Sequence, residues 1–228
     1  MREPFRADDL QIAGLVRLSS CDWPGRLVAT IFLQGCPLAC GYCHNPGILD
    51  PREPGVIAWS EVYGFLRRRR GLLDGAVFSG GEPTRQAGLA DAMRQVRALG
   101  LGVGLHTAGP YPRRFAEVVP LCDWIGLDIK APARLYEKVT GVKSPAAAAA
   151  FACLRIAIES RVDLQVRTTV DPTTMNPADV AELTGQLLAL GVSEHVLQDV
   201  RAEGVRPEYA ERLAAYAVSA TASRGRED

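Results

Sequence analysis

The sequence predicts an α/β protein whose parallel strands curve into a partial (β/α)6 barrel. Six short apolar segments alternate with six segments of helical pattern, and each apolar segment leads directly into a polar or glycine-containing loop. Alternating strands and helices imply a parallel sheet, and right-handed crossovers would curl that sheet into part of a barrel. The 228 residues, of which 47% are hydrophobic, suit one globular domain with a sizeable core.

A short edge hairpin is expected to deliver the first central strand. Residues 13–18 are mostly apolar, and Pro24 and Gly25 favour a turn at low entropic cost. Trp23, just before this turn, is expected to pack beneath the loop that follows the strand. Apolar runs predict the parallel strands at residues 27–33, 74–78, 101–105, 124–129, 163–170 and 195–197.

Capping residues mark the helices between these strands. Ser60 is a suitable N-cap for the first helix, which ends in four arginines, Arg67 to Arg70, before Gly71. Arginines at a helix C-terminus indicate a solvated face favoured by the helix dipole, and a docking patch for an acidic partner is the other interpretation. Asn176 and Pro177 open a later helix. The helices are predicted at residues 60–70, 89–99, 115–119, 146–158, 178–190 and 207–220.

The composition indicates a cytoplasmic protein without nucleic-acid or membrane partners. Twenty-six basic residues balance 26 acidic ones, so no net field would attract nucleic acid or an anionic membrane. The sequence has no run of about twenty apolar residues, and residues 1–6 form no apolar signal segment. Six cysteines without a secretory signal point to a reducing compartment, where thiolates can ligate iron.

Three cysteines in the loop after the first strand, Cys36, Cys40 and Cys43, predict a metal site. Cysteine thiolates hold iron–sulfur clusters, and a tight Gly/Pro-rich loop at the end of a strand keeps such ligands rigid. The other three cysteines lie outside this spacing: Cys21, Cys122 and Cys153. If the cluster is a four-iron cube, one of its irons therefore lacks a protein ligand.

Four other interpretations compete for this loop. A disulfide would leave an odd thiol and needs an oxidising compartment. The run Cys40 to His44 matches the C-x-x-C-H signature of c-type haem, but that attachment requires export. Three buried structural thiols do not suit a loop so polar and rich in turn residues. Zinc on the three cysteines, with His44, stays open, although zinc ligands of this kind usually come as two well separated pairs.

Chemistry in a (β/α) barrel belongs at the carboxyl ends of the strands, where this sequence places polar and glycine residues. Gly80 and Gly81, after the second strand, let a backbone approach a ligand closely. Asp128 and Lys130 share one face at the end of the fourth strand, where they could meet a zwitterionic ligand or pair with each other. The other candidates at strand ends are Glu82, His106, Thr107 and Arg167.

The spacing C-x-x-x-C-x-x-C, followed by the strand–helix repeat, resembles the radical S-adenosylmethionine (SAM) superfamily. The loop of residues 34–46 looks like that of glycyl radical enzyme activating enzymes, closest to the longer form of the anaerobic ribonucleoside-triphosphate reductase activating protein. The resemblance covers about residues 14–201, so we expect a single radical SAM domain over residues 1–228 with a last helix at about 207–220. It implies a partial (β/α)6 barrel of the radical SAM type, a [4Fe-4S] cluster and S-adenosyl-L-methionine.

The resemblance also implies roles for residues of this chain. The three loop cysteines would hold the cluster, and the segment Gly-Gly-Glu-Pro would meet the amino group of the cofactor's methionine part. The segment Asp-Ile-Lys resembles the family's cofactor-end motif. The residues expected at the cofactor are Tyr42, His44, Gly80, Gly81, Glu82, His106, Thr107, Asp128, Lys130 and Arg167, with no catalytic residue beyond the cluster and SAM.

One strand-end segment departs from the family pattern. Formate-lyase-type activating enzymes read Asp-Thr-Asn-Gly where this chain has His106, Thr107, Ala108 and Gly109. Neutral imidazole is a poor ligand for a hard monovalent cation, which argues against a cation beside the cofactor carboxylate. His106 would instead hydrogen-bond that carboxylate directly or be satisfied by neighbouring backbone.

The reaction that the resemblance implies is reductive cleavage of SAM with one electron from a flavodoxin or ferredoxin. The resulting radical would take a hydrogen atom from a glycine of a partner glycyl radical enzyme, expected to be anaerobic ribonucleoside-triphosphate reductase. The alternative is a small-molecule substrate, as in the radical SAM enzymes that make deazapurine precursors. A third interpretation, a cluster that only carries electrons or staples the fold, is disfavoured because a pure carrier needs a closed ligand shell.

Overall fold

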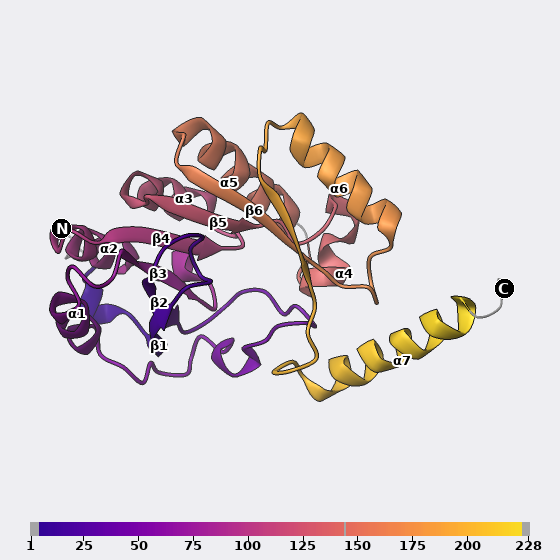
Figure 1. Ribbon diagram of the computed structural model, residues 1–228, viewed down its shortest axis with the longest axis horizontal. Coiled ribbons are helices and arrows are strands. Elements are labelled where there is room, and N and C mark those ends of the chain that lie inside the picture. The colour runs from indigo at the N-terminus through magenta and orange to yellow at the C-terminus, as the bar shows by residue number, and fades with distance from the viewer. Residues whose placement is uncertain (1–4, 144, 225–228) are drawn as a thin grey trace.

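The computed structural model describes residues 5–143 and 145–224, with side chains up to residue 219, and these residues form one seven-stranded sheet (Figure 1). The strands follow the chain order across the sheet. β1 runs antiparallel to β2, and every later neighbour is parallel, which confirms the predicted partial barrel. The strands are β1 Ile12–Ser19, β2 Val28–Leu33, β3 Gly75–Gly80, β4 Gly102–Thr107, β5 Trp124–Asp128, β6 Asp163–Val170 and β7 His195–Asp199.

Helices cover the outer face of the curved sheet, and α7 extends away from the barrel (Figure 1). The α-helices are α1 Trp59–Arg68, α2 Leu89–Ala98, α3 Pro112–Val118, α4 Tyr136–Thr140, α5 Ala146–Ser160, α6 Pro177–Ala189 and α7 Pro207–Arg224. Short 3-10 turns occupy Ala7–Asp9, Pro46–Ile48, Pro83–Arg85, Val119–Leu121 and Ala133–Leu135. No helix in the described ranges has the length and apolar character that crossing a membrane requires.

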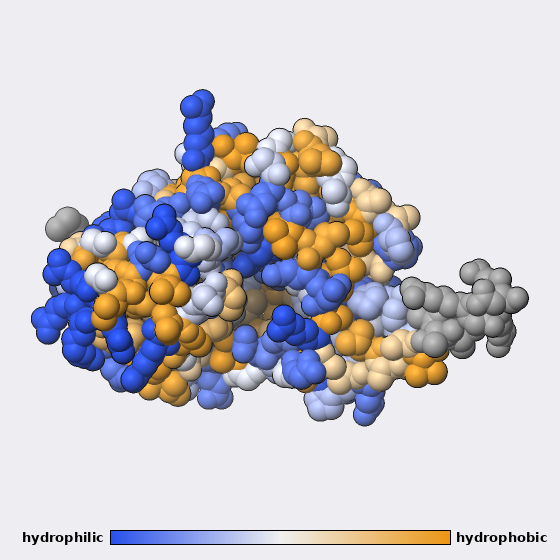
Figure 2. Space-filling model, viewed as in Figure 1, coloured by the Kyte–Doolittle hydropathy of each residue, from blue (hydrophilic) through white to orange (hydrophobic). Residues whose placement is uncertain are grey.

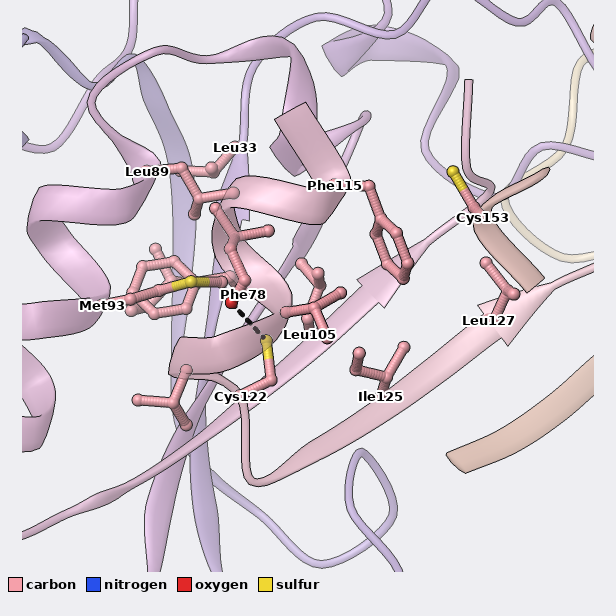
Figure 3. Close-up of a cluster of buried hydrophobic side chains, with 14 of the residues drawn as sticks. Leu33, Phe78, Leu89, Met93, Leu105, Phe115, Cys122, Ile125, Leu127 and Cys153 are labelled. Carbon is pink, nitrogen blue, oxygen red and sulfur yellow. Dashed lines mark hydrogen bonds between the residues drawn. The ribbon is translucent and has the colours of Figure 1, made fainter. Parts of the chain in front are cut away.

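The main core lies between the helices and the sheet (Figure 3). Apolar side chains of the central strands meet those of α2 and α3 in this layer, and the largest of them are fully buried: Phe78, Met93, Leu105, Phe115, Ile125 and Leu127. Two of the cysteines outside the loop belong to this core. Cys122 donates its S–H to the Val118 carbonyl at 3.4 Å, and Cys153 donates to the Gly109 carbonyl at 3.2 Å.

The expected position of Trp23 is wrong. Its ring stacks on Trp124 with centroids 5.7 Å apart, in a small separate cluster near the amino ends of the strands, opposite the cysteine loop. Glycines leave space for the Trp23 ring. A Cβ at Gly104 would lie 3.0 Å from this ring, and a Cβ at Gly102 would lie 3.2 Å from it. Trp23 therefore fills the interior of the barrel at the end away from the predicted chemistry.

The expected cap of the first helix is also wrong, because packing decides where α1 begins. The helix starts at Trp59, after Ala58, with no side-chain cap. The Trp59 ring packs on Phe78 and its Nε1 donates to Gln95 at 2.8 Å, which pulls the residue into the helix. The cap of α6 is as predicted, since Asn176 accepts from two backbone amides at the helix start.

Candidate active site

A cavity of about 320 Å³ lies at the carboxyl ends of the parallel strands. The surface view is hollowed at the centre of the face drawn in Figure 2. The parallel register from Val28 beside Gly75 to Leu33 beside Gly80 brings the carboxyl ends of β2 and β3 level. The cavity is lined by every residue predicted for the site except Glu82: Cys36, Cys40, Tyr42, Cys43, His44, Gly80, Gly81, His106, Thr107, Asp128, Lys130 and Arg167.

Residues 34–46, which we call the cluster loop, leave β2 and are anchored at their first half by backbone hydrogen bonds. The Gly35 amide donates to the Ile48 carbonyl at 2.8 Å, and the Cys36 amide donates to the Leu49 carbonyl at 3.0 Å. Farther along, the Ala39 amide donates to the Thr140 carbonyl of α4 at 2.8 Å. The loop therefore presents its first cysteine from a fixed backbone.

Burial favours the protonated thiol at two of the loop cysteines, Cys36 and Cys40. Burial raises the pKa of the Cys36 thiol to about 12, and burial also raises the pKa of Cys40. A bound metal stabilises the thiolate and reverses this effect. Among the described residues, no three His, Cys, Asp or Glu side chains form a group that could hold a metal ion. The thiolates of an iron–sulfur cube bind different irons, so they need not converge on one point.

Tyr42 connects the cluster loop to the far side of the cavity. Its side chain is 5% exposed, and the Lys130 Nζ lies 5.8 Å from the centre of its ring. Its buried hydroxyl has no hydrogen-bond partner among the described residues. Buried hydroxyls nearly always have a partner, so this group is an unused buried donor of a residue that lines the cavity.

Asp128 holds two cations at the end of β5. Its carboxylate accepts from Lys130 Nζ at 2.9 Å and from Arg167 Nε at 2.9 Å. Burial opposes the charged form of Asp128, but Arg167 and Lys130 outweigh it and hold the pKa of this carboxyl below its usual range. Although burial alone would lower the pKa of Lys130, Asp128 holds it well above the ordinary value. The three side chains thus form a charged network in the cavity wall.

His106 is neutral and satisfied by backbone. Its Nε2 lies 2.7 Å from the Asp22 carbonyl oxygen, which can only accept, so Nε2 carries the proton. Its Nδ1 accepts from the Ser79 hydroxyl at 3.3 Å. Burial, reinforced by the nearby Arg167, lowers the pKa of His106 to about 4. Two roles were expected for His106, and the structure shows the second of them, a hydrogen bond to a nearby backbone carbonyl.

The two glycines after β3 serve a close contact between chain segments. Gly80 has φ +110°, and a Cβ there would collide with the Leu33 backbone. A Cβ at Gly81 would collide with the Gly35 carbonyl, and the Glu82 amide donates to that same carbonyl at 2.9 Å. The sequence predicted an approach to a ligand, whereas here the glycine backbone runs against the start of the cluster loop.

Glu82 does not line the cavity, because its carboxylate is turned into the protein. It is 1% exposed and accepts from the Thr84 hydroxyl at 2.5 Å, the Thr107 hydroxyl at 2.7 Å and the Ala108 amide at 3.0 Å. Burial raises its pKa against these hydrogen bonds. Glu82 therefore fastens the loop after β3 to the loop after β4.

Some lining residues were not among the predicted site residues. Four of them lie at the carboxyl ends of strands or in the cluster loop, where the strand-end rule alone would have found them: Asn45, Ser79, Thr169 and Gln198. Asp22 could not be found in that way. It precedes β2, and only the folded hairpin brings its carbonyl to His106.

Relatives of known name share part of this chain. A protein of Methanocaldococcus jannaschii named as a candidate glycyl-radical enzyme activating enzyme is 28% identical over 181 residues, which are 75% of this chain and 73% of that protein. The pyruvate formate-lyase-activating enzyme of Clostridium pasteurianum is 32% identical over 130 residues, 55% of this chain and 52% of the relative. The match thus spans about half the length of the second relative.

Solved structures have the same fold. Streptococcus suis SuiB bound to S-adenosylmethionine superposes with a TM-score of 0.62 at 13% identity, over 84% of this chain and 46% of SuiB. Residues 30–187, more than half of the chain, match the Radical SAM superfamily. This protein therefore belongs to the radical SAM superfamily, whose members use a [4Fe-4S] cluster and S-adenosylmethionine.

Proposed function

We propose that this protein, as a single radical SAM domain, activates a glycyl radical enzyme by taking a hydrogen atom from a glycine of its partner. The observation that carries the proposal is the meeting of three loop cysteines with the Asp128 network in one cavity. The two relatives, one named as a candidate glycyl-radical enzyme activating enzyme and the other as a pyruvate formate-lyase-activating enzyme, support the same reaction class.

The residues of the cavity fit both cofactors. Three cysteines of one loop leave one iron of a cube for a ligand other than protein. The Tyr42 hydroxyl is an unused buried donor, and Asp128, Lys130 and Arg167 offer charges of both signs to a zwitterion. The cysteines would hold the cluster, and the other lining residues would hold SAM.

The bound cofactors would supply the radical chemistry, in which one electron cleaves SAM to methionine and a 5′-deoxyadenosyl radical. The chain's part is to bind and orient. Lys130 and Arg167 are held by Asp128, so they reach a carboxylate without a large loss of side-chain entropy. The pKa of His106 keeps its ring neutral near pH 7, where it adds no competing charge. Glu82 would act behind the cavity by fixing two strand-end loops.

The proposed partner is anaerobic ribonucleoside-triphosphate reductase, and the proposed electron donor is a flavodoxin or ferredoxin. The resemblance of the cluster loop as a whole supports this partner, and residues 42–46 favour a glycyl radical enzyme over a small-molecule substrate. A glycine in a polypeptide must come within a few ångströms of the radical carbon, which needs an accessible cavity. The cavity lies at the surface between the cluster loop and the ends of β3 to β7, which suits such a substrate.

The test is SAM cleavage without the partner. Reconstituted protein with a strong reductant should slowly form 5′-deoxyadenosine and methionine. The change Asp128→Ala should weaken SAM binding while iron content stays the same, because the carboxylate orders Lys130 and Arg167. Asp50→Ala, which removes an exposed carboxylate paired with Arg52, is the matched control. Normal SAM binding by Asp128→Ala would refute the assignment of this network to the cofactor.

A further inference from the structure

The chain crosses back over the cluster loop after β7. Residues 200–212, which we call the C-terminal brace, comprise the segment after β7 and the first residues of α7. The brace contacts the cluster loop at two places, one before α7 and one within the start of that helix. The Arg201 carbonyl lies 3.3 Å from His44 Nε2, and a Cβ at Gly204 would lie 3.0 Å from the His44 carbonyl. A Cβ at Gly41 would lie 3.0 Å from both Tyr209 and Arg212.

The second half of the cluster loop has few backbone hydrogen bonds of its own. In the described part of the chain, residues 40–45 make only the local backbone hydrogen bonds from the Cys43 amide to the Cys40 carbonyl and from the Ile48 amide to the Asn45 carbonyl. The long-range backbone bonds of the loop all belong to its first half. Packing against the brace is therefore a long-range contact of this stretch, beside the burial of Cys40 and Tyr42 in the main core.

Tyr209 is the centre of the brace. It is 3% exposed, and its hydroxyl donates to Asp171 at 2.8 Å, just beyond the end of β6. Its ring meets that of Tyr42 edge-on with centroids 6.5 Å apart, and the Arg212 guanidinium lies 4.9 Å from the centre of the Tyr209 ring. One side chain thus ties α7 to the barrel and to the cluster loop.

We propose that Tyr209 is a positioning residue, which through the C-terminal brace fixes residues 41–44 and so slows release of the cluster. The brace lies outside residues 30–187, the range that matches the superfamily. The proposal that the brace fixes residues 41–44 follows from the contacts alone. The proposal that it slows release of the cluster rests on the proposed function.

Hydrogen–deuterium exchange of the metal-free full chain tests whether the brace fixes residues 41–44. Tyr209→Phe removes only the hydroxyl, and Tyr209→Ala removes the ring as well. Tyr216→Ala is the matched control, because Tyr216 lies on the same helix and is 43% exposed. We expect the Cys43 amide, which donates to the Cys40 carbonyl, to exchange about tenfold faster in Tyr209→Ala, with a smaller effect in Tyr209→Phe and none in the control. Equal exchange in all four proteins would overturn the proposal.

Release of the cluster is the second readout. The anaerobically reconstituted proteins are mixed with a chelator, and the loss of visible absorbance is followed. We expect Tyr209→Ala to lose its cluster about tenfold faster than the wild type and Tyr216→Ala to match the wild type. Equal rates would disprove the role in retention. A wild type that takes up no iron would refute the proposed function instead, and the exchange experiment would still decide the brace.

Discussion

At the scale of single residues, the cysteines differ in what surrounds them. The three of the cluster loop line the cavity, whereas Cys122 and Cys153 donate to backbone carbonyls inside the helix–sheet core. Their roles could be separated in the sequence by spacing alone. The inward orientation of the Glu82 carboxylate could not be predicted from the sequence, because two of its partners, Thr107 and Ala108, lie at the end of a different strand.

Replacement of a loop cysteine should abolish the cluster. We expect Cys36→Ala, Cys40→Ala and Cys43→Ala each to prevent binding of about four irons and four sulfides. Cys153→Ala keeps the loop intact and is the control, which should bind iron as the wild type does. Iron and sulfide analysis after anaerobic reconstitution checks this. Stoichiometric zinc without iron-dependent visible absorption in anaerobically purified protein would contradict it.

The neutral state of His106 makes the fold sensitive to acid. Its folded pKa of about 4 lies below the ordinary value of 6.5, so its contribution to stability is complete above pH 6.5 and is lost as the pH falls towards 4. Between pH 7 and pH 5 this amounts to about 2 kcal/mol of the free energy of unfolding. Denaturant unfolding of the metal-free protein at both pH values should give this loss, and His106→Gln should remove it. The same pH dependence in that variant would disprove the assignment.

At the scale of elements, the sequence predicted the strands well because each is a buried apolar run. β3, β4 and β7 continue two residues past the expected ends, since pairing with a neighbour extends a strand beyond its apolar residues. The short helix α4 was not predicted, because Tyr136–Thr140 is too short for a helical repeat to appear. The position of Trp23 depended on glycines of two other strands, β3 and β4, which no local pattern reveals.

The contact between the β3 loop and the cluster loop should not tolerate a methyl group. Gly81→Ala places a Cβ against the Gly35 carbonyl, a backbone atom that cannot move aside alone. We expect a loss of about 2 kcal/mol in the free energy of unfolding, together with weaker SAM binding. Gly47→Ala is the control in the same region, because nothing lies within 4 Å of its added Cβ. Equal stability of the two variants by thermal unfolding would contradict the close approach.

At the scale of the whole molecule, the alternation of strands and helices was enough to predict the topology, and parallel topology places the site at the strand ends. The four exposed arginines at the end of α1 lie just before the amino end of β3, away from the cavity. This position agrees with the interpretation of these arginines as a solvated helix face. The C-terminal brace could not be predicted. Its contacts depend on the path of the chain after β7, and its sequence carries no motif.

Electron paramagnetic resonance of the complete reaction tests the proposed activity most directly. The reduced protein, SAM and anaerobic ribonucleoside-triphosphate reductase are incubated without oxygen, and the spectrum is recorded. We predict the doublet of a glycyl radical, which disappears when the radical glycine of the reductase is changed to Ala. The absence of a doublet with every glycyl radical enzyme of the source organism, together with turnover of a small molecule, would contradict the proposed function.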